Sequence, residues 1–391
     1  MKILIIGAGM YVTGRNQTGT GTILSSIAQF SKTNPIEKIV IAAKSKSNND
    51  IVKQETRRIN QTINSSIETS YVEIQVNTKK FVEDLCNKND FDCAIISIPD
   101  HLHFDFTYEL MKNGIHCLVV KPLVGTVREN IQLIDIQKET KTYGAVEFHK
   151  RFDETNLFIK KALNDKNIGK LLYFTVDYSQ KIDIPLNVFK SWAAQTNIFQ
   201  YLGVHYVDMI FFLTGFLPFK VMSYGTRGVL VEKGINTYDS VHASIVWRSP
   251  NNKKETFISQ FNTNWIDPNC TSAMSDQKYK IIGTNGRIEC DQKNRGLEVV
   301  CANHGIRQIN PYFSDYLPGI EGTLEFSGYG YKSISQFFID VMVLKENDSL
   351  LSSFEKTRPT FSQALVSTTV IEAVNNSLTD NNWREIQHET F

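Results

Sequence analysis

The chain opens with MKILIIGAGMYVTGR (residues 1–15), and this stretch decides the fold. Lys2–Ile6 is a run of aliphatic residues, typical of a strand that is buried on both faces of a parallel sheet. Gly7 permits a tight turn out of that strand, and Gly9 lacks a Cβ, so a pyrophosphate can lie against the backbone amides. A strand, a glycine pair and a following helix predict a dinucleotide site that also includes Met10 and Tyr11.

The segment after Gly9 departs from the usual spacing of such sites. The third glycine normally comes three residues after the second, but here Gly14 comes five residues later, and TGTG (18–21) follows. We expect the first long helix to begin near Thr22. The insertion 10–21 either adds amide and hydroxyl donors for the phosphates or is an elaboration of the surface, and the sequence favours neither.

Strand-like and helix-like segments alternate through the first 148 residues. The predicted strands are 2–6, 38–42, 72–76, 93–98, 116–120 and 145–148, and the predicted helices between them include 51–64, 79–87 and 104–113. This alternation predicts an α/β, doubly wound parallel sheet, the Rossmann type. Ligands of such sheets bind beyond the carboxyl ends of the strands, where Gly7, Pro99 and Lys121 all fall.

The end of the second predicted strand bears on which dinucleotide binds. It reads Ala43-Lys44-Ser45-Lys46-Ser47, with no carboxylate before Asp50. A free ribose 2′-hydroxyl is usually met by an acidic residue at this position, whereas a 2′-phosphate needs cations and hydroxyls. Lys44, Ser45 and Lys46 therefore favour NADP(H), and NAD(H) remains possible.

The second half of the chain has the period of two that half-buried strands show. Phe174, Val176 and Tyr178 alternate with polar residues, and so do Val241, Ala243, Ile245 and Trp247. We divide the chain into a dinucleotide-binding domain, 1–148, and a substrate-binding and oligomerisation domain, 149–391. Further predicted strands are 221–231, 256–263, 279–282 and 297–301, and the predicted helices are 206–219, 333–344 and 362–377. A sheet that helices cover on one face leaves the other to a partner, and its aromatic content predicts a homodimer or homotetramer.

Length, charge and cysteine usage narrow the class of protein. At 391 residues two domains are expected, and a net charge of +1 provides no basic field for nucleic acid or a membrane surface. The six cysteines show no metal-ligand spacing, so we expect reduced thiols, no metal site and a cytoplasmic protein. The opening apolar run does not resemble a signal peptide, and the helix 206–219 is too short to span a bilayer.

The stretch IPDHLHFDFTYELMKNGIHCLVVKPL (98–123) resembles the glucose–fructose oxidoreductase / inositol dehydrogenase / MocA (Gfo/Idh/MocA) family. Members carry a TPN..H turn, a G.H strand entry and a Glu-Lys-Pro triplet. Pro99 and His103 match the turn, with Asp100 at the asparagine position, and Gly114 and His116 match the strand entry. Lys121-Pro122 matches the triplet, but Val120 replaces its glutamate.

A second signature lies in GVHYVDMIFFLTG (203–215), where family members place an aspartate four residues before a catalytic histidine. His205 matches the histidine, and Tyr201 occupies the aspartate position. The segments RFDE (151–154), IGKL (168–171) and GTNGRIE (283–289) extend the likeness over nearly the whole chain. The resemblance implies a Rossmann half followed by an α+β domain with a large, mostly antiparallel sheet. It also implies a pyridine-nucleotide oxidoreductase acting on sugars, inositols or nucleotide-sugars.

The resemblance and elementary chemistry together give a candidate site. A lysine that is desolvated beside a cationic nicotinamide loses its proton more readily, so Lys121 is the expected base, with His205 and Tyr201 as proton relay or hydrogen-bonding groups. Ile98, Pro99, His103 and Lys121 are expected along the cofactor, and Lys121, Arg151, Tyr201 and His205 along the substrate. Lys150, Asn262, Asn264, Trp265 and Tyr238 are further candidates for substrate contact, although each is more readily explained as an ordinary surface residue.

Two classes of function fit these residues. The first is an oxidoreductase, which Lys121 favours. The second is a non-catalytic dinucleotide sensor on the same fold, which the substitutions Val120 and Tyr201 keep open.

Overall fold

The computed structural model describes residues 1–14, 20–74, 77–303, 305–320 and 322–387, which form two compact units. Unit 1 comprises Met1–Val124, Arg128–Asp153 and Tyr312–Ala364. Unit 2 comprises Gly125–Val127, Glu154–Pro311 and the residues from Leu365 onward. The units therefore divide the chain differently from the sequence-based boundary at 148/149, because 312–364 returns to the first unit.

Helix α10 (Tyr329–Glu346) explains this return. Its side chains Ile334, Phe337, Phe338 and Val341 are buried in the same cluster as the first strand and helix α2. Burying four such side chains stabilises the segment on the first sheet by several kcal/mol, at roughly 1.5–3 kcal/mol each. The periodicity of 333–344 predicts a helix but does not reveal which sheet it covers.

A parallel six-stranded sheet forms the centre of unit 1, in the order β3-β2-β1-β4-β5-β6. Its strands are β1 (Lys2–Ile6), β2 (Lys38–Ala43), β3 (Thr69–Glu73), β4 (Cys93–Ile96), β5 (His116–Val120) and β6 (Gly144–Glu147). The strand order reverses direction between β1 and β4, and the crevice beyond that point is where such sheets bind ligands.

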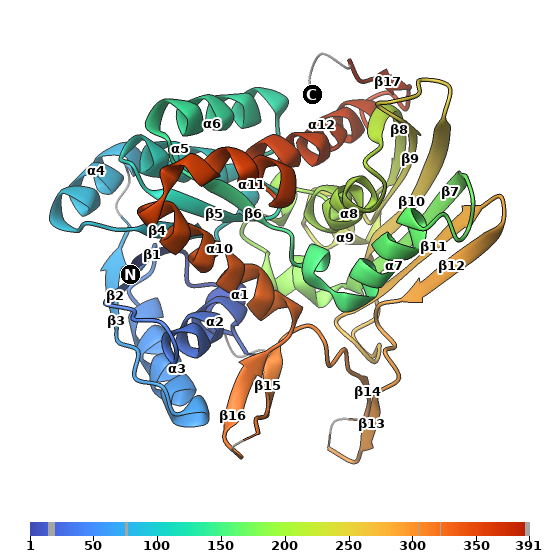
Figure 1. Ribbon diagram of the computed structural model, residues 1–391. Coiled ribbons are helices and arrows are strands. Elements are labelled where there is room, and N and C mark those ends of the chain that lie inside the picture. The colour runs from blue at the N-terminus through green and yellow to red at the C-terminus, as the bar shows by residue number, and fades with distance from the viewer. Residues whose placement is uncertain (15–19, 75–76, 304, 321, 388–391) are drawn as a thin grey trace. The chain divides into compact units, whose positions relative to one another are not determined.

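Helices cover both faces of this sheet (Figure 1). One face packs against α2, α3 and α10, and the other lies under α4, α5 and α6. The helices of unit 1 are α1 (Met10–Thr13), α2 (Thr22–Ser31), α3 (Asn48–Ile63), α4 (Thr78–Lys88), α5 (His103–Lys112), α6 (Val127–Thr140), α10 and α11 (Leu351–Thr357), and its hairpin is β15 (Asp315–Pro318) with β16 (Leu324–Ser327). The predicted doubly wound α/β sheet is confirmed.

Unit 2 is built on a seven-stranded sheet of order β12-β11-β7-β10-β9-β8-β17, in which β7 and β10 are parallel and every other neighbouring pair is antiparallel. The strands are β7 (Leu171–Lys181), β8 (Leu217–Thr226), β9 (Ser240–Arg248), β10 (Thr256–Asp267), β11 (Ser275–Gly283), β12 (Gly286–Asp291) and β17 (Arg384–Glu385). A separate hairpin pairs β13 (Glu298–Cys301) with β14 (Gly305–Gln308). The large, mostly antiparallel sheet is as predicted.

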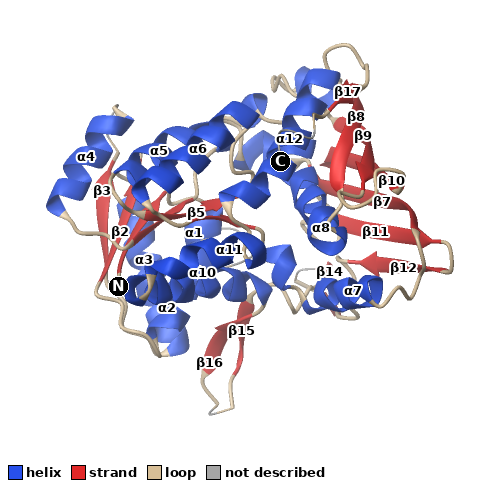
Figure 2. Ribbon diagram, turned by 45° about the horizontal axis from the view of Figure 1, so that its top comes forward, coloured by secondary structure: helices blue, strands red, loops and turns tan. Residues whose placement is uncertain are grey.

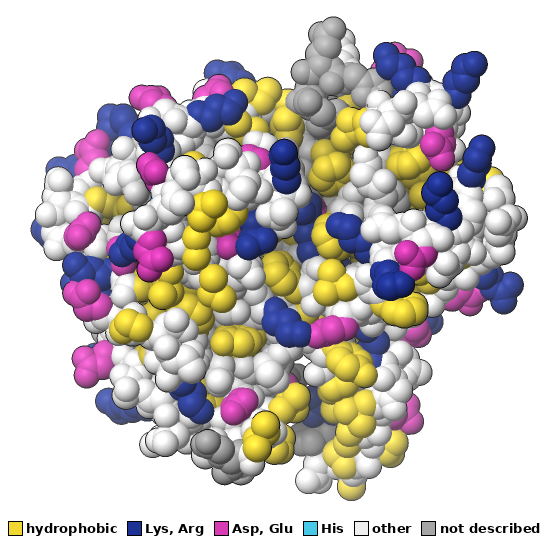
Figure 3. Space-filling view, viewed as in Figure 1, with side chains coloured by type: hydrophobic (Ala, Val, Ile, Leu, Met, Phe, Trp, Pro, Cys, Tyr) yellow, Lys and Arg dark blue, Asp and Glu magenta, His cyan; other side chains and the backbone are white. Residues whose placement is uncertain are grey.

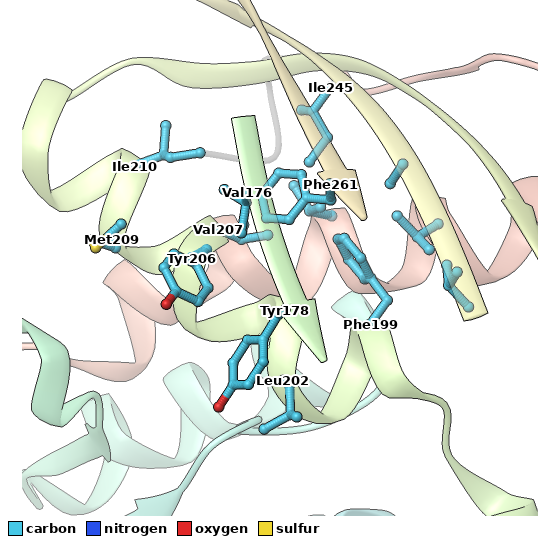
Figure 4. Close-up of a cluster of buried hydrophobic side chains, with 14 of the residues drawn as sticks. Val176, Tyr178, Phe199, Leu202, Tyr206, Val207, Met209, Ile210, Ile245 and Phe261 are labelled. Atoms are coloured by element: carbon cyan, nitrogen blue, oxygen red, sulfur yellow. The ribbon is translucent and has the colours of Figure 1, made fainter. Parts of the chain in front are cut away.

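Helices cover one face of this sheet: α8 lies along it in Figure 2. Figure 4 shows Tyr206, Val207 and Ile210 of α8 beside Val176 of β7 and Ile245 of β9 in one buried cluster. The helices of unit 2 are α7 (Glu154–Asn164), α8 (Val204–Thr214), α9 (Val229–Glu232) and α12 (Phe361–Ser377), the first turn of which belongs to unit 1.

Several predicted boundaries need correction. The strand predicted at 72–76 begins at Thr69 and ends at Glu73, and 75–76 lie outside the described residues. The strand predicted at 221–231 ends at Thr226, and Val229–Glu232 is a helix. The amides of Val229 and Leu230 both donate to the Asp239 carboxylate at 2.8 Å. These bonds stabilise the first turn of the helix, and the residues next to Val229 give no signal that a helix begins there.

The surface carries both signs of charge, interspersed over the face that Figure 3 shows. Among the described residues no helix has both the length and the hydropathy needed to cross a membrane. The six cysteines form no disulfide, and Cys93, Cys117 and Cys290 are buried.

Candidate active site at the carboxyl edge of the parallel sheet

The loops that follow β1, β2, β4, β5 and β6 leave the sheet at one edge, because parallel strands share their direction. Most residues predicted to bind cofactor lie in these loops, so the sheet of unit 1 brings them together. Tyr201 and His205 belong to unit 2.

The two glycines after β1 have different structural roles. Gly7 has φ +110°, and a Cβ there would lie 2.0 Å from the Ser97 carbonyl oxygen, so only glycine lets the β1 and β4 loops approach. A Cβ on Gly9 would meet no described atom within 4 Å. The Gly9 backbone therefore faces open space, as close approach of a pyrophosphate requires, and the residues fit a dinucleotide.

The short helix α1 starts directly after Gly9, and α2 starts at Thr22 as predicted. A Cβ on Gly21 would lie 2.2 Å from the Val12 carbonyl oxygen, so the beginning of α2 packs tightly on α1. Residues 15–19 of the insertion lie outside the described residues, and both interpretations of the insertion remain open.

Tyr71 of β3 stabilises the turn after β2, because its hydroxyl donates to the carbonyls of Ala43 and Ser45 at 2.9 and 2.6 Å. The side chains of 44–47 are exposed. Lys46 Nζ lies 4.0 Å from a carboxylate oxygen of Glu73, at the end of β3. The turn thus presents two cations and two hydroxyls to a ligand, with one acidic neighbour that the sequence pattern did not indicate.

His103 ties two loops together. Its Nδ1 lies 2.8 and 3.2 Å from the carbonyl oxygens of Pro122 and Leu123, and its Nε2 lies 2.9 Å from that of Ile98. The ring is buried, and this burial lowers the pKa of His103 against the opposing effect of Asp100 and the three carbonyls. We expect His103 to affect a bound cofactor through the loops that it holds.

Lys121 follows the last residue of β5, in a cis peptide with Pro122. Burial lowers the pKa of its amine from 10.5 to about 7, while the charges of Glu147 and Asp100 raise it and that of Lys150 lowers it further. An amine with a pKa near 7 exchanges its proton at physiological pH, so it suits a general base or acid.

Glu147 and His149 are charged or polar neighbours of this site that the sequence analysis missed. Glu147 ends β6, is 2% exposed, and one of its carboxylate oxygens lies 2.9 Å from His149 Nδ1. A glutamate inside the apolar run 145–148 was the available signal. Asp100, which occupies the asparagine position of the family's turn, is also buried, and its charge raises the pKa of Lys121.

Lys150 and Arg151 lie in a 3₁₀ turn, His149–Phe152. Both are buried. The Arg151 guanidinium donates to Gln363 and lies 5.9 Å from the centre of the Phe148 ring. Gln363 and the Phe148 ring thus hold the guanidinium within unit 1. Contact between Arg151 and a substrate remains a prediction.

In unit 2, His205 is buried in the first turn of α8. Tyr201 lies one turn earlier, in η5 (Phe199–Gly203), with its ring centre 4.9, 5.9 and 5.9 Å from those of Phe189, Trp192 and Trp265. An aromatic cluster therefore surrounds Tyr201, where family members have a carboxylate.

The other substrate candidates have separate surroundings. Trp265 is fully buried and donates from Nε1 to Gln180, and the Tyr238 ring lies under Arg227. Asn262 and Asn264 lie on the open face of the sheet, bonded to Asp177 and Ser179. The role of these four residues in binding substrate stays a prediction.

The strand order, the crossover between β1 and β4 and the glycine loop define a Rossmann dinucleotide-binding fold. The chain belongs to the Gfo/Idh/MocA family: residues 1–148 match the model described as "Oxidoreductase family, NAD-binding Rossmann fold", and residues 157–289 match the model of the family's C-terminal domain. The predicted family resemblance is confirmed.

Individual relatives are distant. The chain is 24% identical over 207 residues to inositol 2-dehydrogenase of Rhizobium meliloti, covering 52% of this chain and 58% of that protein. It is 23% identical over 166 residues to the NADP(+) scyllo-inositol 2-dehydrogenase of Bacillus subtilis, covering 42% and 45%. The matches thus span about half the length of these curated relatives. The solved scyllo-inositol dehydrogenase of Lactobacillus casei with NAD(H) and scyllo-inositol has the same fold, with a TM-score of 0.63 over 98% of both chains at 16% identity.

The contacts of His103 generate a stability prediction. His103→Ala removes a buried ring whose nitrogens lie within hydrogen-bond distance of carbonyls in two loops, so we expect the free energy of unfolding to fall by about 2–4 kcal/mol, measured by denaturant titration. His101→Ala, two residues earlier and exposed, is the control and is expected to stay within about 0.5 kcal/mol. Unchanged stability with lost dinucleotide affinity would instead assign His103 a direct contact with the cofactor.

Proposed function

We propose that this protein is an oxidoreductase that favours NADP(H) and interconverts a secondary alcohol and a ketone of a sugar, an inositol or a nucleotide-sugar. The observation that carries the proposal is Lys121, which lies at the carboxyl edge of a dinucleotide-binding sheet and whose amine has its pKa lowered to about 7. The inositol dehydrogenases among the relatives support the substrate class.

Gly7, Gly9 and the first amides of α1 would hold the pyrophosphate, and the turn 44–46 would hold the adenosine ribose. Ile98 and Pro99 would lie along the nicotinamide side, in the loop that His103 fixes. When bound, the nicotinamide supplies or accepts the hydride. The chain's own task is then the proton on the substrate oxygen.

Lys121 performs that task in both directions. As the neutral amine it takes the proton of the hydroxyl during oxidation, and as the ammonium it returns the proton to the ketone oxygen during reduction. We assign His205 a hydrogen bond to the reacting oxygen and Tyr201 a supporting hydroxyl. A tyrosine is a much weaker acceptor than a carboxylate, so Tyr201 orients a histidine less firmly than aspartate does.

The charge of Lys121 predicts the pH dependence. For oxidation the neutral amine is required, so kcat/KM should fall about tenfold per pH unit below about pH 7 and level off above it; reduction should show the reverse. Lys121→Met should lower kcat/KM for oxidation by about 10²–10⁴ while dinucleotide affinity stays within a few-fold. Steady-state absorbance of the reduced nicotinamide with a panel of inositols and sugars measures both, and Lys112→Met, an exposed lysine on α5, is the control.

The same panel separates the enzyme from the sensor. A protein that binds dinucleotide and a polyol but oxidises no member of the panel, and reduces none of the matching ketones, would favour the non-catalytic regulator. Normal turnover by Lys121→Met would place the base elsewhere.

The turn after β2 predicts the cofactor preference. Native protein should bind NADPH more tightly than NADH, and Lys44→Ala/Lys46→Ala should weaken NADPH binding about tenfold while leaving NADH within twofold, since the lost partner is the 2′-phosphate. Fluorescence titration measures both constants, and Lys138→Ala on α6 is the matched control. An equal or reversed preference in the native protein would contradict the assignment and give Glu73 the larger influence.

We further propose a cytoplasmic homodimer or homotetramer that associates through the open face of the seven-stranded sheet. This face carries a hydrogen-bonded row, Asp177–Asn262–His242, with neighbouring serine and glutamine side chains. Light scattering after gel filtration should give twice or four times the chain mass of 44.5 kDa, and Asn262→Arg should dissociate the assembly. Asn251→Arg, in the exposed turn between β9 and β10, should not; a monomeric native protein would contradict the proposal.

A further inference from the structure

Strands β5 and β6 place positions 120 and 147 side by side. Val120 and Glu147 are register partners, and partners in neighbouring parallel strands point to the same face of the sheet. Position 120 directly precedes Lys121 and is the position at which the Glu-Lys-Pro triplet has its glutamate. This chain has an apolar residue there and a glutamate on the adjacent strand.

Glu147 is buried more deeply than an ordinary surface carboxylate, with a side chain that is 2% exposed. Burying a carboxylate costs several kcal/mol unless charges or hydrogen-bond donors offset the loss of water. One oxygen of Glu147 has the imidazole of His149 at 2.9 Å. Lys121 provides the positive charge, because Glu147 is the neighbouring charge that raises the pKa of the Lys121 amine most.

The second oxygen of Glu147, Oε1, is the one that does not face His149, and the carboxylate as a whole acts on Tyr11. Burial raises the pKa of the Tyr11 phenol, and the charge of Glu147 raises it further. The Tyr11 hydroxyl and this oxygen of Glu147 are both buried polar atoms that meet no hydrogen-bond partner at ordinary geometry among the described residues. Because its pKa is raised, the Tyr11 phenol keeps its proton and stays uncharged beside the carboxylate.

His149 is held in turn by two rings from the segment that returns to unit 1. Phe313 lies edge-on to it with 5.2 Å between centroids, and Tyr329 of α10 stacks on it at 5.6 Å. Glu147 is therefore bordered by α1, by the turn after β6 and, through His149, by α10. Such a surrounding fixes the orientation of a carboxylate and keeps water away from it.

We propose that Glu147 is a positioning residue that supplies, from β6, the carboxylate that the segment before Lys121 lacks at position 120, and that it controls the charge of the Lys121 amine. The catalytic consequence rests on the proposed function, but the electrostatic statement does not. The titratable and charged groups around the pair are Asp100 from the loop after β4, His149 and Lys150 from the turn after β6, Tyr11 from α1 and Tyr329 from α10.

These neighbours fix the sign of the effect. Burial and Lys150 favour the neutral amine of Lys121, and Glu147 and Asp100 favour the ammonium. Removing the charge of Glu147 leaves Asp100 to oppose burial, so the amine must lose its proton at a lower pH. An opposite charge within about 4–6 Å changes a pKa by about one to three units.

The test is a direct titration of the Lys121 amine in protein without dinucleotide. Lysine labelled with ¹³C at the ε position is followed by NMR, and the Lys121 signal is assigned as the one absent from Lys121→Met. We expect a midpoint near pH 7 for native protein and at least about one pH unit lower for Glu147→Gln. Glu147→Asp should show a smaller change, and Asp135→Asn, an exposed carboxylate on α6, should show none.

A double variant moves the charge across the sheet. Val120→Glu/Glu147→Gln returns a carboxylate to the neighbouring position on the same face, so its midpoint should return toward pH 7. An unchanged or higher midpoint in Glu147→Gln would overturn the proposal. If the midpoint of the double variant were as low as that of Glu147→Gln, positions 120 and 147 would not be equivalent places for the carboxylate. If Glu147→Gln does not fold, the double variant decides alone: a midpoint near 7 supports the proposal, and a lowered one overturns it.

Kinetics then separate this inference from the proposed function. If both hold, the acid limb of kcat/KM for oxidation moves to lower pH in Glu147→Gln together with the NMR midpoint. A residue with a purely structural role would lower the rate at every pH without moving the limb. NMR midpoints that move as expected in a protein without turnover would sustain the role of Glu147 and refute the enzyme.

Discussion

The site depends on one constraint: an amine must change its charge near neutral pH in surroundings that solvate an ammonium poorly. Burial alone would leave Lys121 neutral, and a permanently neutral amine accepts a proton from a substrate hydroxyl only weakly. Glu147 and Asp100 oppose burial, and Lys150 reinforces it. The resulting pKa of about 7 reflects this balance, so each of these side chains matters although none of them needs to touch a substrate.

The parallel sheet makes this balance possible because it gathers residues that are distant in sequence. Asp100 follows β4, Lys121 follows β5, and Glu147 ends β6, so three neighbouring strands each deliver one charge to the same edge. The buried His103 ring then lies between the β4 and β5 loops, with its nitrogens 2.8 Å from the Pro122 carbonyl and 2.9 Å from the Ile98 carbonyl. The backbone positions from which these charged side chains project are thereby fixed by the sheet and its loops.

Features of the fold and site that depend on residues close together in the sequence could be predicted, whereas features that depend on distant residues could not. The glycine loop, the alternation of strands and helices and the position of Lys121 at a strand end were predictable, because hydrophobic period and glycine placement are read along the chain. Glu147 was not, because its importance comes from its register with Val120. Tyr312–Ala364 joins unit 1 for a similar reason, since an amphipathic pattern shows that a face is buried but not which sheet buries it. The short helix at Val229 depends on Asp239, ten residues later, and local propensity cannot report it.

Two of the substitutions that set this chain apart from its family's motifs, Val120 and Tyr201, have different physical consequences. At position 120 the missing carboxylate has a counterpart on the adjacent strand, so the charge is relocated while the electrostatics of the lysine persist. At position 201 the tyrosine ring packs among Phe189, Trp192 and Trp265, and a phenol polarises a histidine less than a carboxylate does. The first substitution therefore leaves the chemistry of the proton intact. The second, under the proposed function, replaces the carboxylate that the family places before its histidine with a weaker acceptor.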